Sequence, residues 1–119
     1  MEMFDFTSLQ EPRLPVKLGY KDGEGRLQNV QVLNVKAVDV ALMKRLLATA
    51  QELKATKTHD EKYILRVFDI VADVLSCNDE QVVITGAQLH DTYKMSFVAA
   101  VKFVGAYMAF VNEVAAAKN

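Results

Sequence analysis

An apolar residue recurs at every second position over residues 14–20 (LPVKLGY), which is the period of a half-buried β-strand. Residues 21–25 (KDGEG) follow and contain two glycines, which is typical of a turn. A β-branched run then occupies residues 27–35 (LQNVQVLNV). The pattern predicts an antiparallel hairpin over residues 13–35, with Pro15 on an edge strand because proline has no N–H to donate.

After the hairpin, the apolar residues change to the three-to-four-residue spacing of amphipathic helices. Asp39 is a suitable N-cap for a helix over residues 40–55 (VALMKRLLATAQELKA). Residues 58–61 (THDE) have the pattern of a capping box and predict a second helix, which ends near Cys77 and Asn78. The apolar face of this second helix is expected to contain Ile64, Val67, Phe68, Val71, Val74 and Leu75.

A second capping-box pattern at residues 85–88 (TGAQ) predicts a helix that begins at Gly86. The pattern leaves open whether this helix breaks around Asp91 and Thr92 before the terminal helix. We therefore expect an α+β protein, mostly α, with an N-terminal antiparallel β-hairpin followed by three to four helices. Because two strands alone are marginal in water, the helices are expected to form the core and the hairpin to lie at its periphery.

The terminal segment, residues 96–117 (SFVAAVKFVGAYMAFVNEVAAA), is helical in period but apolar on almost every side. One stripe contains Phe97, Val101, Val104, Met108, Val111 and Ala115. A second stripe contains Phe103, Tyr107, Phe110 and Val114. A helix at the surface of a small protein needs only one apolar stripe. We expect the first stripe to pack on the chain's own core and the second to meet a partner or a second copy.

The predicted partner-binding face is built on the line of aromatic residues in this terminal segment. It comprises Phe103, Tyr107 and Phe110, with Met108 at its edge, together with Gly105 and Val114. The absence of a side chain at Gly105 would let a partner backbone approach closely. The alternative, in which the hairpin covers the aromatic line and makes it part of the core, stays open.

Composition indicates a folded single domain over residues 1–119, since 51% of the residues are hydrophobic and only two are proline. Residues 1–12 have no clear period and are expected to form a peripheral arm before the hairpin (13–35) and the helical part (38–117). Fourteen basic and fifteen acidic residues are interspersed and leave a net charge of −1. Without a basic face, nucleic acid is not an expected partner.

The chain is expected to be soluble and cytoplasmic. Its single cysteine, Cys77, cannot form an intrachain disulfide, and its acidic start does not have the pattern of a signal peptide. The longest apolar window, residues 97–111, contains Lys102 and is about fifteen residues long, against the roughly twenty that a bilayer requires. We therefore expect no membrane span.

Few residues offer catalytic chemistry. Cys77 with His59 or His90 is the only thiol–imidazole combination, and nothing in the local sequence marks such a site. The sequence has no HxxxH or CxxC spacing for a metal. Residues 19–25 (GYKDGEG) are glycine-rich but lack the ending of a phosphate-binding loop. We expect a protein that is not an enzyme and that needs no cofactor or metal.

The layout resembles the tail assembly chaperones of long-tailed (siphovirus-type) bacteriophages, which are small, mostly helical and without catalytic motifs. The resemblance rests on the β-rich start LPVKLGY…LQNVQVLNV, the two amphipathic helices, the connector LSCNDEQVVITGAQLHDTY and the aromatic-rich end FVGAYMAFVNEV. It covers most of the chain and is a match of pattern and size.

The resemblance implies a protein that binds the tape measure protein and keeps that long apolar chain soluble until tail-tube subunits polymerise around it. The expected function is thus that of a non-catalytic, chaperone-like binding protein in the host cytoplasm, which covers apolar helical segments of a phage tape measure protein. Self-association is a second expectation, because the uncovered stripe can also meet a second copy. Two alternatives remain, namely a structural phage tail or connector subunit and an unrelated small helical adaptor.

Overall fold

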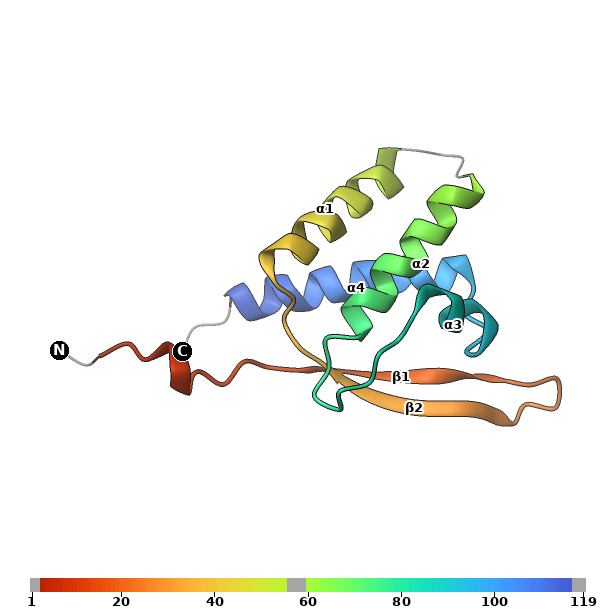
Figure 1. Ribbon diagram of the computed structural model, residues 1–119, viewed down its shortest axis with the longest axis horizontal. Helices are drawn as coiled ribbons and strands as arrows, with labels where there is room; N and C mark the ends of the chain where they lie inside the picture. The colour runs from red at the N-terminus through yellow and green to blue at the C-terminus, as the bar shows by residue number, and fades with distance from the viewer. Residues whose placement is uncertain (1–2, 56–59, 117–119) are drawn as a thin grey trace.

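A computed structural model describes residues 3–55 and 60–116 of the chain (Figure 1). It consists of an antiparallel β-hairpin followed by helices, so the expected α+β, mostly helical fold is confirmed. The helix that begins at Gly86 ends at Asp91, and a separate helix begins at Phe97, so the described part contains four α-helices. The elements are a short 3₁₀ turn η1 (Phe6–Ser8), β1 (Leu14–Lys21), β2 (Leu27–Val35), α1 (Val40–Ala55), α2 (Glu61–Leu75), α3 (Gly86–Asp91) and α4 (Phe97–Ala116).

The hairpin is antiparallel, as expected, and its register contains one irregularity. Leu14 pairs with Val35 and Val16 with Leu33, but the register shifts between Leu18 and Tyr20. Gly19 lies at this shift with φ of +137°, a backbone conformation that only glycine adopts readily. A side chain there would also meet the carbonyl oxygen of Gln28 at 3.0 Å. The bulge therefore depends on glycine at this position.

The inner face of the hairpin belongs to the core. Leu18, Leu33 and Val35 are buried in the same cluster as the helices. The expectation of a hairpin peripheral to a purely helical core is therefore wrong. The physical reason is that α2 and α4 each have more apolar surface than the other helices cover, so the sheet face completes their burial.

Local hydrogen bonds explain where the helices begin. The Asp39 carboxylate accepts from the N–H of Leu42 at 2.8 Å, so α1 has the predicted N-cap. The N-cap of α2 is Asp60, which accepts from the N–H of Tyr63 at 2.8 Å. The predicted cap at Thr58 lies outside the described residues. The capping box of α3 is confirmed, because Thr85 and Gln88 each accept from the other's backbone N–H.

Two buried or half-buried polar side chains organise the connector between α2 and α3. Asn78 is buried, and its side chain bonds the backbone of Leu75 and of Val82 at 2.7–3.0 Å. The Ser76 hydroxyl exchanges hydrogen bonds with the N–H and the carbonyl of Ile84. The connector also pairs with the end of β2, since the N–H of Lys36 donates to the carbonyl of Cys77 at 2.7 Å.

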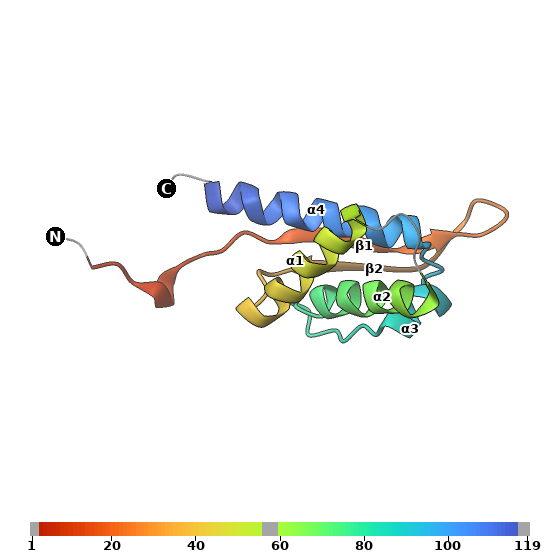
Figure 2. The ribbon, with the colours of Figure 1, turned by 90° about the horizontal axis from the view of Figure 1, so that it is seen from above.

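α2 is the central helix of the molecule. It packs against α1, α3 and α4 and also contacts β2. Its predicted apolar face is buried except for Ile64, which is half-buried, and Tyr63, Ile70 and Ala72 are buried in addition. α4 runs along the hairpin on another side of the molecule, as two perpendicular views show (Figures 1 and 2). This arrangement leaves one long side of α4 facing away from the core.

Candidate partner-binding surface

α4 buries a line of residues that lies between the two predicted stripes. Ala100, Val104 and Tyr107 are its buried residues, at the helical spacing of four and three. The sequence pattern places Val104 in the first stripe and Tyr107 in the second. The buried side of the helix therefore includes one residue of each stripe and coincides with neither. The neighbours on both sides of this line are half-buried.

Tyr107 is a core residue. Its side chain is fully buried, and its hydroxyl donates to the carbonyl of Lys36 at 3.0 Å and accepts from the N–H of Val38 at 3.1 Å. Burial raises the pKa of this phenol above its ordinary value. The expectation that Tyr107 lies on an accessible partner-binding face is therefore wrong. The segment between β2 and α1 covers it, because that segment has backbone groups that need a hydrogen-bond partner.

The remaining predicted residues lie on different sides of the buried line. Phe103, Phe110 and Val114 are half-buried on one side, and we call these three residues the α4 flank. The rings of Phe103 and Phe110 both pack on Tyr107, with centroid distances of 6.1 and 5.9 Å. Tyr107 thus supports the α4 flank from beneath, and the two phenylalanines keep part of their surface in solvent.

Met108 and Gly105 are not part of this flank. The helical period places Met108 on the opposite side of the buried line, where it is half-buried. Gly105 lies on the outward side, and a Cβ there would meet no atom within 4 Å. The outward side also carries Ala106 and Ala109, so it is small and apolar. Lys102 and Glu113 are the two charged residues of α4.

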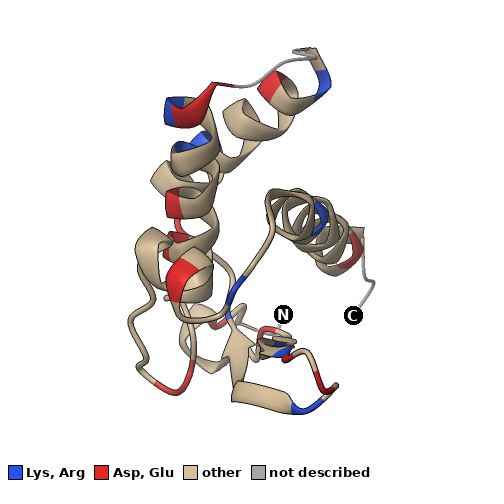
Figure 3. Cartoon of the chain, turned by 90° about the vertical axis from the view of Figure 1, so that its right-hand side faces the viewer, with Lys and Arg blue, Asp and Glu red and all other residues tan. Residues whose placement is uncertain are grey.

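α4 therefore has more apolar surface than the chain itself covers. In the end-on view its ribbon is mostly uncharged, whereas charged residues gather on α1, α2 and the loops (Figure 3). By length and composition alone, this 20-residue helix could also cross a membrane, and 17% of its apolar window is buried. That likeness is weak evidence, because core helices of soluble proteins have the same length and composition.

A groove lies beside the C-terminal half of α4, and we call it the α4 groove. It has a volume of about 190 Å³, and Glu11 is its single charged lining residue. The lining residues are Glu11, Pro12, Ala37, Phe110, Val111, Val114 and Ala115. Sequence reasoning identified only the part on α4, since the other walls come from distant segments that share no period with it.

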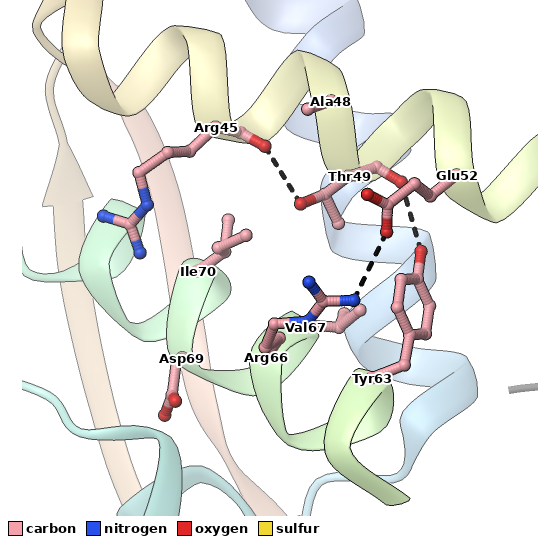
Figure 4. A pocket seen from close by; sticks show the side chains of 9 residues that line it. All are labelled: Arg45, Ala48, Thr49, Glu52, Tyr63, Arg66, Val67, Asp69 and Ile70. Carbon is pink, nitrogen blue, oxygen red and sulfur yellow. Dashed lines mark hydrogen bonds and ion pairs between the residues drawn. The ribbon is translucent and has the colours of Figure 1, made fainter. Parts of the chain in front are cut away.

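A second cavity, of about 280 Å³, lies between α1 and α2 (Figure 4). Its two arginines both have carboxylate partners, with Arg66 at 3.6 Å from Glu52 and Arg45 at 2.9 Å from Asp73. The guanidinium of Arg66 also lies over the Tyr63 ring at 5.3 Å. These contacts join the two helices, and they leave the cavity without a converging set of groups aimed at a ligand.

The candidate thiol and imidazole groups have local structural partners. Cys77 is half-buried, its Sγ lies 3.5 Å from the carbonyl of Asp73, and burial raises the pKa of its thiol. The His90 ring bonds the Asp91 carboxylate at 2.8 Å and packs edge-on against Phe68. His59 lies outside the described residues. Within residues 3–55 and 60–116, no three His, Cys, Asp or Glu side chains form a group that could hold a metal.

No protein-family model matches the chain, and neither a curated protein nor a solved structure shows significant similarity to it. The functional argument therefore rests on the α4 flank, the α4 groove and the outward side of α4.

Proposed function

We propose that this chain is a non-catalytic, chaperone-like binding protein that covers an apolar helical segment of another protein. The observation that supports this proposal is the incomplete burial of α4. Phe103 and Phe110 are held by Tyr107 yet keep part of their surface in solvent, and the small, exposed Ala106 lies one turn from Phe103 beside them.

The chemistry of this surface favours an apolar helix as the partner. Large apolar side chains left in water forgo roughly 1.5–3 kcal/mol of burial each, so covering them is the main source of affinity. A ridge of aromatic residues next to small residues lets a second helix pack closely. Lys102 and Glu113 lie along the outer edge of this ridge, with Glu113 one turn from Phe110, so a fitting partner helix is apolar at its centre and polar at that edge.

The class of partner that we propose rests on the resemblance to phage tail assembly chaperones. A tape measure protein is long and helical, and its apolar segments need cover before the tail tube forms around them. We propose that the α4 flank, with the small residue Ala106 beside it, binds such segments in the host cytoplasm, whereas Gly105 lies outside this surface. In this proposal Tyr107 supports the two phenylalanines of the flank, and Met108 lies across the buried line from them and does not contact the partner.

The proposal is tested by co-expression with a phage tape measure protein, for which a long, helix-rich open reading frame beside this chain would be the candidate. The wild-type chain should raise the soluble yield of that protein, and the double variant F103S/F110S should lose this effect. V101S/M108S is the matched control, because it removes half-buried apolar surface from the opposite side of α4. Circular dichroism establishes that both variants are folded.

Each outcome has a defined meaning. Loss of solubility rescue in the flank variant but not in the control supports the proposed surface. Equal rescue by all forms places the binding site elsewhere on the molecule. A wild-type chain that gives no rescue contradicts the chaperone function, and recovery of the chain from purified virions favours the structural tail or connector subunit.

A further inference from the structure

The N-terminal arm has an apolar surface that its own chain does not cover. The described part of the arm, residues 3–12, is exposed throughout and leads away from the hairpin (Figures 1 and 2). The exposed fractions are 88% for Met3, 67% for Phe4, 78% for Phe6 and 46% for Leu9. Large apolar patches of this kind on a soluble domain usually mark an interaction site.

The arm is locally ordered around its aromatic pair. The Asp5 carboxylate accepts hydrogen bonds from the N–H and the hydroxyl of Thr7 and thereby caps η1. This turn holds the rings of Phe4 and Phe6 edge to face, with their centroids 4.8 Å apart. The two rings therefore form one preformed unit, which lowers the entropy cost of docking.

The root of the arm is fixed beside the α4 groove of its own chain, and the rest of the arm leads away from that groove (Figures 1 and 2). The Arg13 guanidinium donates to the carbonyl of Glu11 at 2.7 Å and to both carboxylate oxygens of Asp79 at 3.0 Å. Pro12 restricts Glu11 to extended backbone. A return of Phe4 and Phe6 onto their own groove would need a chain reversal at this root, which these contacts oppose.

The α4 groove matches the arm in size and chemistry. Its volume of about 190 Å³ exceeds the roughly 150 Å³ of an apolar cavity that binds benzene, so it can hold one phenyl ring. Phe110, Val111 and Val114 supply its apolar wall. The other wall includes Glu11 and Pro12 at the root of the arm, so the groove and the base of the arm are adjacent on one molecule.

We propose that two copies of this chain associate by arm exchange, with the Phe4–Phe6 pair of each copy docked on the α4 groove of the other and one of its two rings inside the groove. The adjacency of arm root and groove makes the exchange reciprocal about a two-fold axis. Each arm offers on the order of 500 Å² of accessible surface. Two arms with the groove surfaces that they cover reach the roughly 1,200–2,000 Å² of a standard stable interface.

Arm exchange does not require the partner helix of the proposed function, so the two can fail separately. The test is analytical ultracentrifugation of the full chain over a range of concentrations. We expect a dimer that dissociates on dilution. F4S/F6S should raise its dissociation constant at least about tenfold, since burial of each phenylalanine contributes more than that factor.

A groove variant and a control complete the design. A115E places a carboxylate at an exposed position of the groove and should weaken the dimer in the same way. V83S removes an apolar side chain that is 75% exposed and does not line the groove, and it should leave the dimer unchanged. All three variants alter only exposed residues, so the fold should persist.

Cross-linking separates exchange from return of the arm to its own groove. In a Cys77→Ser background, one tagged chain carries F6C and a second, differently tagged chain carries A115C. Arm exchange predicts a disulfide between the two tags on mixing. A third form carries F6C and A115C on one chain and reports return of the arm to its own groove. The proposal is overturned by a monomer at all concentrations or by a dimer that neither F4S/F6S nor A115E weakens. It is also overturned by a cross-link that forms only within this third form.

Discussion

At the scale of the residue, Tyr107 decides how α4 sits on the molecule. Its ring is fully buried, and its hydroxyl satisfies two backbone groups of the segment between β2 and α1. A phenylalanine has the same apolar surface and could not make these two bonds. The tyrosine therefore determines the rotation of the helix, and Phe103 and Phe110 are half-exposed as a consequence.

Tyr107→Phe should lower the free energy of unfolding by about 1–3 kcal/mol, because it removes two part-buried hydrogen bonds, one to the carbonyl of Lys36 and one from the N–H of Val38. Urea denaturation measures this loss. Tyr93→Phe is the matched control, since its hydroxyl bonds the Gln31 side chain at 2.9 Å at a less buried site. An equal loss in both variants would contradict a special role for Tyr107.

Two glycines should respond to alanine in opposite directions. A Cβ at Gly86 would press on the Asp69 carboxylate and lie 3.2 Å from the Asp69 backbone nitrogen, so Gly86→Ala forces the Asp69 side chain to move and should destabilise the fold. At Gly105 there is open space inside a helix, and Gly105→Ala should stabilise the chain by about 0.5–1 kcal/mol. Thermal unfolding followed by circular dichroism checks both signs.

At the scale of the element, the hairpin is the part whose role differs most from expectation. Its strands lie where the alternating pattern puts them, yet Leu33 and Val35 are as completely buried as the centre of α2. Two strands do not persist alone in water, and here the apolar surfaces of α2 and α4 stabilise them. The buried residues of the hairpin in turn complete the hydrophobic core that the helices form only in part.

Leu33→Ala should lower the free energy of unfolding by about 2–5 kcal/mol, as expected for a cavity in a closely packed core. Val32→Ala, at the next position of the same strand, is the control because Val32 is 52% exposed. It should cost well under half as much. Chemical denaturation of the two variants gives the comparison, and equal losses would mean that the hairpin does not belong to the core.

At the scale of the whole molecule, the chain separates into a packed body and a projecting arm. The body contains the hairpin and the helices, and the longest dimension of the molecule, 59 Å, includes the arm. The described residues of the arm are all exposed, and the ion pair between Arg13 and Asp79 marks its junction with the body. Stability should therefore reside in the body and self-association in the arm.

Removal of residues 1–9 should change the free energy of unfolding by no more than about 0.5 kcal/mol, since exposed positions contribute little. The truncation keeps Glu11, Pro12 and Arg13 and so preserves the junction. Denaturation and circular dichroism measure its effect. A truncated chain that unfolds would show that the arm stabilises the body.

The sequence by itself determined the features that are encoded within a few neighbouring residues. The strand and helix bounds follow from periodicity, and the caps at Asp39 and Thr85 follow from side chains that bond the next turn. Only the tertiary structure decided which side of α4 is buried, because that helix is apolar all round and each side offers a similar free energy of transfer. Contacts of Tyr107 with the distant residues Lys36 and Val38 settled the choice.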